Sequence, residues 1–115
     1  MSDLHDLTLR LREFAHARDW EQFHSPKNLS MALIVEAAEL VEHFQWLTEA
    51  QSYTLAPDKL HAVEQEMADV FIYLVRMADR LGVDLVAAAW RKIDINAGKY
   101  PADQVRGKAG KPVDF

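Results

Sequence analysis

The chain has 115 residues and no cysteine, which excludes disulfides, thiolate catalysis and cysteine metal sites. Half of its residues are hydrophobic and 27% are charged, as in a soluble globular domain. The formal net charge of −5, the absence of a basic stripe and the absence of an apolar run of roughly 20 residues argue against nucleic-acid and membrane partners. Because the first residues also lack the pattern of a secretion signal, we expect a cytoplasmic protein.

Helical periodicity runs through most of the chain, and no segment shows the alternation of a half-buried strand. Four helices are predicted, at about residues 3–20, 26–47, 58–81 and 85–97. Ser25 or Asn28 is expected to cap the second helix, with Pro26 in its first turn. Gly82 should end the third helix, and Asp84 should cap the fourth.

The last part of the chain is rich in residues that break helices. Gly98 and Pro101 stop the fourth predicted helix, and further breakers follow at Gly107, Gly110 and Pro112. We therefore expect one domain at residues 1–101 and an irregular tail at 102–115. The predicted fold class is all-α, a bundle of about four antiparallel helices.

An internal repeat relates the second and third predicted helices. After a shift of 30 residues, Leu33, Glu36 and Glu39 fall on Val63, Glu66 and Asp69. At about 100° per residue, each pair of carboxylates lies at the border of its helix's apolar arc and not opposite that arc. An isolated E-x-x-E is usually a solvated helix face, but two pairs at matching angles are harder to explain in that way. If the two helices pack together, four carboxylates converge.

Converging carboxylates need protons, basic partners or a metal ion, because packing desolvates them and they repel one another. Hard oxygen ligands in this number suit Mg²⁺, with Mn²⁺ as a substitute. The candidate metal ligands are Glu36, Glu39, Glu66 and Asp69. The pattern by itself leaves an ordinary acidic face open as the alternative.

The segments around these acids resemble the MazG-like all-α nucleoside triphosphate pyrophosphohydrolases, on the branch related to dCTP pyrophosphatases. The resembling stretches are Trp20-Glu-Gln-Phe-His24, Ser25-Pro-Lys-Asn-Leu29, Glu36-Ala-Ala-Glu-Leu40, Phe44-Gln-Trp46, Glu66-Met-Ala-Asp-Val70 and Lys92-Ile-Asp-Ile-Asn96 with Lys99-Tyr100-Pro101. The resemblance covers about residues 4–101. It implies that the four acids hold Mg²⁺ and that a nucleoside triphosphate, dCTP or a modified pyrimidine nucleotide first, is cleaved into a monophosphate and pyrophosphate. Glu36 or Glu39 is the expected base.

The fourth predicted helix offers candidate phosphate contacts. Lys92, Asn96 and Lys99 lie on one helix face, and Tyr100 follows them. Spacing alone favours an ordinary polar face, whereas the resemblance to the family's K-x-x-x-N-x-x-[KR]-Y pattern implies substrate binding. Lys99 stands where arginine is frequent, so a bidentate clamp on phosphate would be lost there.

Aromatic side chains are the candidates for binding a flat base. The resemblance implies that Trp20 and Trp46 flank the base, whereas Trp90 lies among alanines and is expected in a core or an interface. His24 is expected either to line the base pocket or to serve as a structural cap. Tyr73 is expected to reach a phosphate oxygen.

Two other functions stay open at this point. A di-iron carboxylate bundle would use Glu-x-x-His pairs; Glu13-x-x-His16 and Glu21-x-x-His24 exist, but they straddle one helix and its end. A non-enzymatic adaptor would oligomerise through apolar faces.

A single subunit of this length is too small to cover all its apolar faces. We therefore predict a homo-oligomer, and the resemblance favours a tetramer over a dimer. The base, its modification, the number of metal ions and the carboxylate that activates water stay open.

Overall fold

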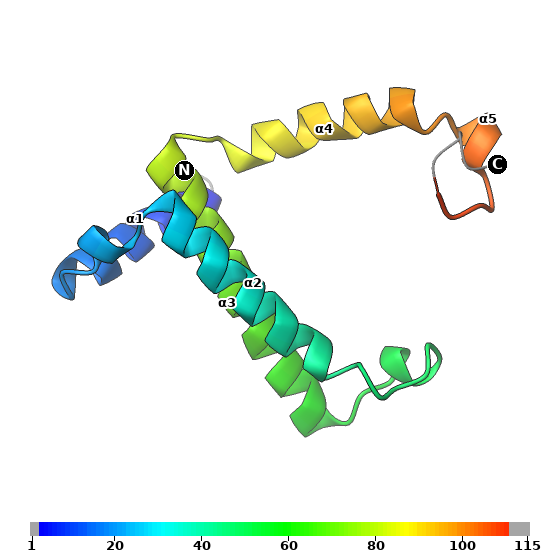
Figure 1. Cartoon of the computed structure of the whole chain (residues 1–115), viewed down its shortest axis with the longest axis horizontal. Helices are drawn as coiled ribbons and strands as arrows, with labels where there is room; N and C mark the ends of the chain where they lie inside the picture. The colour runs from blue at the N-terminus through cyan, green and yellow to red at the C-terminus, as the bar shows by residue number, and fades with distance from the viewer. Residues whose placement is uncertain (1–2, 111–115) are drawn as a thin grey trace. The chain divides into compact units, whose positions relative to one another are not determined.

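The computed structural model describes residues 3–110, and over this part of the chain every regular element is a helix (Figure 1). The α-helices are α1 Asp3–Ala17, α2 Pro26–Glu42, α3 Pro57–Leu81, α4 Leu85–Lys99 and α5 Ala102–Val105. Two short 3₁₀ helices, Glu21–Phe23 and Gln51–Tyr53, lie in the connections. The predicted all-α class is confirmed. Within the described residues, no helix has the length and apolar character that a membrane span requires.

The helix ends follow local chemistry where a capping residue is present. The Ser25 side chain accepts a hydrogen bond from the Asn28 backbone N–H at 3.1 Å, so Ser25 and not Asn28 caps α2. Gly82 ends α3 with φ 68°, in the left-handed region that favours glycine. The Asp84 side chain caps α4 by accepting from the Ala87 backbone N–H at 3.0 Å.

Two helices are shorter than their apolar periodicity predicts. α1 ends at Ala17 because Asp19 adopts φ 54°, through which a right-handed helix cannot continue. α2 ends at Glu42, where backbone bonds to the third preceding carbonyl, such as Phe44 N to Val41 O, replace the α-helical pattern. Trp20 and Trp46 therefore lie outside the regular helices.

The elements fall into two units, Met1–Gly82 and Val83–Phe115. In the first unit α2 and α3 form an antiparallel hairpin, and α1 packs against α3 (Figure 1). The buried apolar side chains of this unit come from all three helices; they are Ala15, Leu29, Val63, Val75 and Ala78. This packing holds the α2 and α3 faces that carry the acidic residues against each other.

The second unit contains α4 and α5. Residues 102–115 were predicted as an irregular tail, but Ala102–Val105 form α5, which starts after Pro101 and has Asp103 in its first turn, where a negative charge is favourable. Gly107, with φ 74°, follows the helix. Residues 111–115, and with them Pro112, lie outside the described residues. The domain boundary at residue 101 stays a prediction.

Candidate active site

Three glutamates from the α2–α3 hairpin converge on one point. Glu36 and Glu39 come from α2 and Glu66 from α3, and each offers a carboxylate oxygen within 4.8 Å of the other two. All three side chains are half-buried. The internal repeat therefore places them together as predicted. Asp69, one turn beyond Glu66, is more exposed and does not belong to this tight group, although its charge acts on Glu36.

The cluster makes an ionised Glu36 unfavourable. Burial raises the pKa of Glu36 to about 7, helped by the close carboxyl groups of Glu39 and Glu66 and by the charges of Glu39 and Asp69. At neutral pH the Glu36 carboxyl is therefore about half protonated. This carboxyl can exchange a proton in the range where enzymes work, which suits a general base.

Two oxygens of the cluster lack a stabilising partner. Glu36 Oε2 and Glu66 Oε2 are buried and have no hydrogen-bond partner among the described residues. A buried carboxylate oxygen without a donor is costly, and a divalent cation would satisfy both oxygens at once. The donor set consists of carboxylate oxygens, which are the ligands that Mg²⁺ and Mn²⁺ prefer. The residues present therefore fit a divalent metal site.

An aromatic pocket of about 300 Å³ adjoins this cluster. Its walls come from α1, α3 and the segment between α1 and α2; they are formed by Leu11, Phe14, Ala15, Trp20, His24, Asp69, Ile72, Tyr73 and Arg76. The Trp20 ring stands edge-on to Phe14 at 5.8 Å and to His24 at 6.3 Å. Such a mostly apolar space with a few polar groups is typical of small-molecule sites.

Asp69 and Tyr73 join the pocket to the acids. Both line the pocket, and both lie close enough to the cluster for charge effects. Burial, followed by the charges of Glu36 and Asp69, raises the pKa of Tyr73. The phenol therefore keeps its proton and can donate a hydrogen bond. A ligand in the pocket would have the acidic cluster at one end.

Within the first unit, one predicted substrate residue is not brought into this pocket. Trp46 lies in the turn after α2 with 87% of its surface exposed, and it does not line the pocket. Lys92, Asn96, Lys99 and Tyr100 belong to the second unit. Their part in substrate binding stays a prediction.

Phe14 and Arg76 are pocket residues that sequence reasoning missed. Phe14 repeats at helical spacing with Leu11, and periodicity alone places it on the apolar face of the first helix with no indication of a pocket. Arg76 interrupts an apolar run of α3, and only 5% of its surface is exposed. A lone arginine on a buried helix face is the signal that could have found it, because such a charge needs a specific partner.

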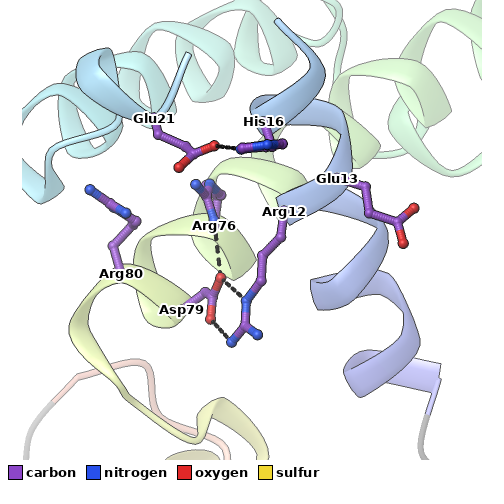
Figure 2. A pocket seen from close by; sticks show the side chains of 7 residues that line it. All are labelled: Arg12, Glu13, His16, Glu21, Arg76, Asp79 and Arg80. Carbon is purple, nitrogen blue, oxygen red and sulfur yellow. Dashed lines mark hydrogen bonds and ion pairs between the residues drawn. The ribbon is translucent and has the colours of Figure 1, made fainter. Parts of the chain in front are cut away.

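A second pocket, of about 490 Å³, shares Arg76 with the aromatic pocket and is lined by charged residues (Figure 2). Its walls are formed by Arg12, Glu13, His16, Glu21, Arg76, Asp79 and Arg80. The three arginines are matched by three carboxylates, and His16 Nδ1 lies 2.6 Å from Glu21 Oε1 (Figure 2). The acidic cluster consists of three glutamates within the described chain and contains no histidine. The Glu13–His16 and Glu21–His24 pairs that a di-iron site would need are therefore not part of it.

Comparisons with known proteins find named relatives over most of the chain. The dCTP pyrophosphatase 1 of Rattus norvegicus is 45% identical to the chain over 114 residues, covering 97% of this chain and 67% of that protein. The protein of the same name from Homo sapiens is 44% identical over the same shares. The crystal structure of a pyrophosphatase from Archaeoglobus fulgidus DSM 4304 superposes with a TM-score of 0.83 at 36% identity, over 88% of this chain and 94% of that chain.

The MazG-like family matches residues 31–111, a range that contains all four predicted acidic ligands. With this match, and with relatives above 40% identity over nearly the whole chain, the chain belongs to the MazG-like family.

Proposed function

We propose that this protein hydrolyses a pyrimidine deoxynucleoside triphosphate, dCTP or a base-modified relative of it, to the monophosphate and pyrophosphate. The carrying observation is the juxtaposition of three glutamates within 4.8 Å of one another and an aromatic pocket that shares Asp69 with their surroundings. The relatives named dCTP pyrophosphatase and the pyrophosphatase structure support a nucleoside triphosphate pyrophosphohydrolase.

The metal would be held by Glu36, Glu39, Glu66 and Asp69, as Mg²⁺ with Mn²⁺ as a substitute. When bound, it supplies the positive charge that offsets the cluster and the polyphosphate, and it makes water more acidic. The two unpartnered oxygens of Glu36 and Glu66 support this assignment. The number of ions is left open, because it depends on where the phosphates lie.

The reaction transfers the α-phosphoryl group to water. The water oxygen attacks the α-phosphorus, and the bond from this phosphorus to the oxygen that bridges it to the β-phosphate breaks in line. Glu39 or Glu36 accepts the proton that the water loses. The bridging oxygen leaves with pyrophosphate, whose charge Lys92 and Lys99 would help to neutralise.

The base would occupy the aromatic pocket. Stacking on an aromatic ring such as Trp20 contributes about 1–3 kcal/mol per base. Tyr73 donates towards a phosphate oxygen near the acids, and Asn96 and Tyr100 would contact phosphate or sugar. Trp46 is exposed in the single chain, so it would take part only once another surface covers it.

Product analysis tests this function. With Mg²⁺ present, we expect dCTP to give dCMP and pyrophosphate in equal amounts, measured by anion-exchange chromatography over the common nucleotides. Pyrimidine substrates should turn over faster than purine ones, a preference that the similarity to proteins named dCTP pyrophosphatase supports.

Orthophosphate together with a diphosphate would mean cleavage at the γ-phosphate and would exclude the proposed reaction. Faster turnover of purine nucleotides would keep the reaction class and exclude the pyrimidine assignment.

The subunit should assemble into a homo-oligomer, for which we propose a tetramer. Large apolar side chains are exposed in the single chain, among them Ile34 at 64% and Val41 at 59% on α2 and Trp90 at 66% on α4. Such surfaces are normally covered by a partner. Light scattering at micromolar concentration should give four times the chain mass of 13.1 kDa.

Ile34→Glu should lower this mass, because it places a charge in the covered surface. Lys27→Glu, at the exposed start of the same helix, should leave the mass unchanged. A stable monomer for the wild-type protein would contradict the assembly.

A further inference from the structure

Arg76 is a buried charge at the wall of the aromatic pocket. Only 5% of its surface is exposed, and a guanidinium in such a place is stable only with specific partners. Its Nη1 donates to Asp79 Oδ2 at 3.0 Å, and its Nε donates to His24 Nδ1 at 3.2 Å. The first bond gives the charge an ionised partner. The second bond connects Arg76 to a ring that lines the same pocket.

Asp79 is held in place from its other side (Figure 2). Arg12 Nε and Nη2 donate to the two carboxylate oxygens of Asp79 at 2.8 and 2.6 Å, a bidentate pair of fixed geometry. The hydrogen bond from Arg12, followed by the charges of both arginines, lowers the pKa of Asp79 despite its burial. The carboxylate therefore stays ionised and fixes the orientation of the Arg76 fork.

The bond from Arg76 determines which nitrogen of His24 carries the proton. The Nε–H of arginine can only donate, so His24 Nδ1 must accept and cannot itself be protonated. A neutral imidazole with a bare Nδ1 carries its hydrogen on Nε2. Burial, followed by the charges of Arg76 and Arg80, also lowers the pKa of His24, which favours the neutral ring. The ring nitrogen left for a ligand is thus a donor.

We propose that Arg76 is a positioning residue: it fixes His24 with its proton on Nε2, so that the ring donates a hydrogen bond to an acceptor atom of the base in the aromatic pocket. A pyrimidine offers such an acceptor as a carbonyl oxygen or a bare ring nitrogen. The part of this inference that concerns the base rests on the proposed function. The part that concerns the ring does not.

A purely structural role for Arg76 would not explain its hydrogen bond to His24. Arg76 already has an ionised partner in Asp79, and Arg80 Nε donates to the backbone carbonyl of His24, which already ties this segment to α3. The Arg76–His24 bond does not balance a charge, and it is not needed to anchor the backbone. What it adds is the choice of tautomer.

The tautomer can be measured without substrate. Long-range ¹H–¹⁵N correlation spectra of the full-length protein at neutral pH distinguish a ring with the proton on Nε2 from the other forms, and His24→Gln identifies the signal among the five histidines. We expect the Nε2–H form for His24. Arg76→Lys should give a mixture of tautomers. Arg10→Lys is the matched control, because Arg10 is exposed on α1 and lines neither pocket, and it should leave the His24 spectrum unchanged. A proton on Nδ1, or a charged ring, in the wild-type protein would overturn the inference.

Kinetics with dCTP and Mg²⁺ test the donation to the base. A glutamine amide can place an N–H near the position of Nε2, whereas the shorter asparagine cannot. His24→Asn should raise KM about three- to tenfold with kcat nearly unchanged, as expected for a lost binding hydrogen bond, and His24→Gln should recover most of this loss. Arg76→Lys should also raise KM, while the exposed Arg10→Lys should match the wild type.

These outcomes separate the two levels of the proposal. Equal KM values for wild type, His24→Asn and His24→Gln would overturn the donor role while the proposed function stands. If the wild type does not hydrolyse dCTP, the proposed function fails and donation to a base fails with it, whereas the spectra still decide the role of Arg76. If Arg76→Lys does not fold, the wild-type spectra and the two His24 variants carry the test.

Discussion

Excess chelator should reduce hydrolysis of dCTP to background, and Mg²⁺ or Mn²⁺ should restore it. Three carboxylates within 4.8 Å, the nearby charge of Asp69 and a triphosphate cannot share one site without a cation. Neutralising the four acids would bring the formal net charge from −5 to −1, so these four side chains account for most of the net negative charge. Pyrophosphate release measured across a metal titration gives the dependence.

Circular dichroism of the chelated sample is the control and should show an unchanged helix content, because the α2–α3 packing rests on apolar contacts. Turnover at the full rate in chelator would exclude the metal site. An optical spectrum recorded with added iron tests the di-iron alternative. Mg²⁺ sites are colourless, so only a di-iron site would give a coloured protein.

Glu36→Gln should lower kcat at least about 100-fold while the protein stays folded. The amide has the shape of the carboxylate, but it is a weaker metal ligand and cannot accept a proton from water, a contribution of about 10²–10⁴ in rate. Glu64→Gln is the matched control: it lies on α3, two residues before Glu66, and is exposed. Its kcat should equal that of the wild type. Wild-type turnover by Glu36→Gln would remove Glu36 from the reaction.

The same variant should stabilise the metal-free protein above neutral pH. The pKa of Glu36 is raised from 4.5 to about 7 on folding, so the native state binds more protons than the unfolded state between these values. The stabilising effect of its proton is present at low pH and is lost as pH rises through about 7.

Glu36→Gln removes this loss, which we expect to be on the order of 1–2 kcal/mol in the free energy of unfolding after allowance for solvent screening. Urea unfolding in chelator over a range of pH measures this difference. Equal pH dependence for wild type and Glu36→Gln would contradict the raised pKa. An adaptor without catalysis would share the gain in stability but would have no turnover to lose.

Features that depend on helical period and local capping could be predicted from the sequence. Glu36, Glu39 and Glu66 meet because the 30-residue repeat places them on the facing sides of two packed helices. Ser25 marks the start of α2 because its side chain accepts a hydrogen bond from a free backbone N–H of the first turn. Gly82 marks the end of α3 because it can adopt the left-handed conformation found there. In these cases nearby residues determine the outcome.

Features that depend on distant contacts could not be predicted. The Arg76–His24 and Arg12–Asp79 bonds join residues 52 and 67 positions apart, and no local pattern indicates such pairs. The ends of α1 and α2 were predicted too late because apolar periodicity continues where the backbone already turns. Likewise, the separation of Asp69 from the tight glutamate group depends on where each side chain points.

The half-protonated state of Glu36 links cation uptake to the acidity of the medium. A carboxyl with a pKa of about 7 must give up its remaining proton before both of its oxygens can serve as ligands. Binding of a divalent cation at neutral pH should therefore release a fraction of a proton into the buffer. The apparent affinity for the cation should rise as the solution becomes more alkaline and level off once Glu36 is fully ionised.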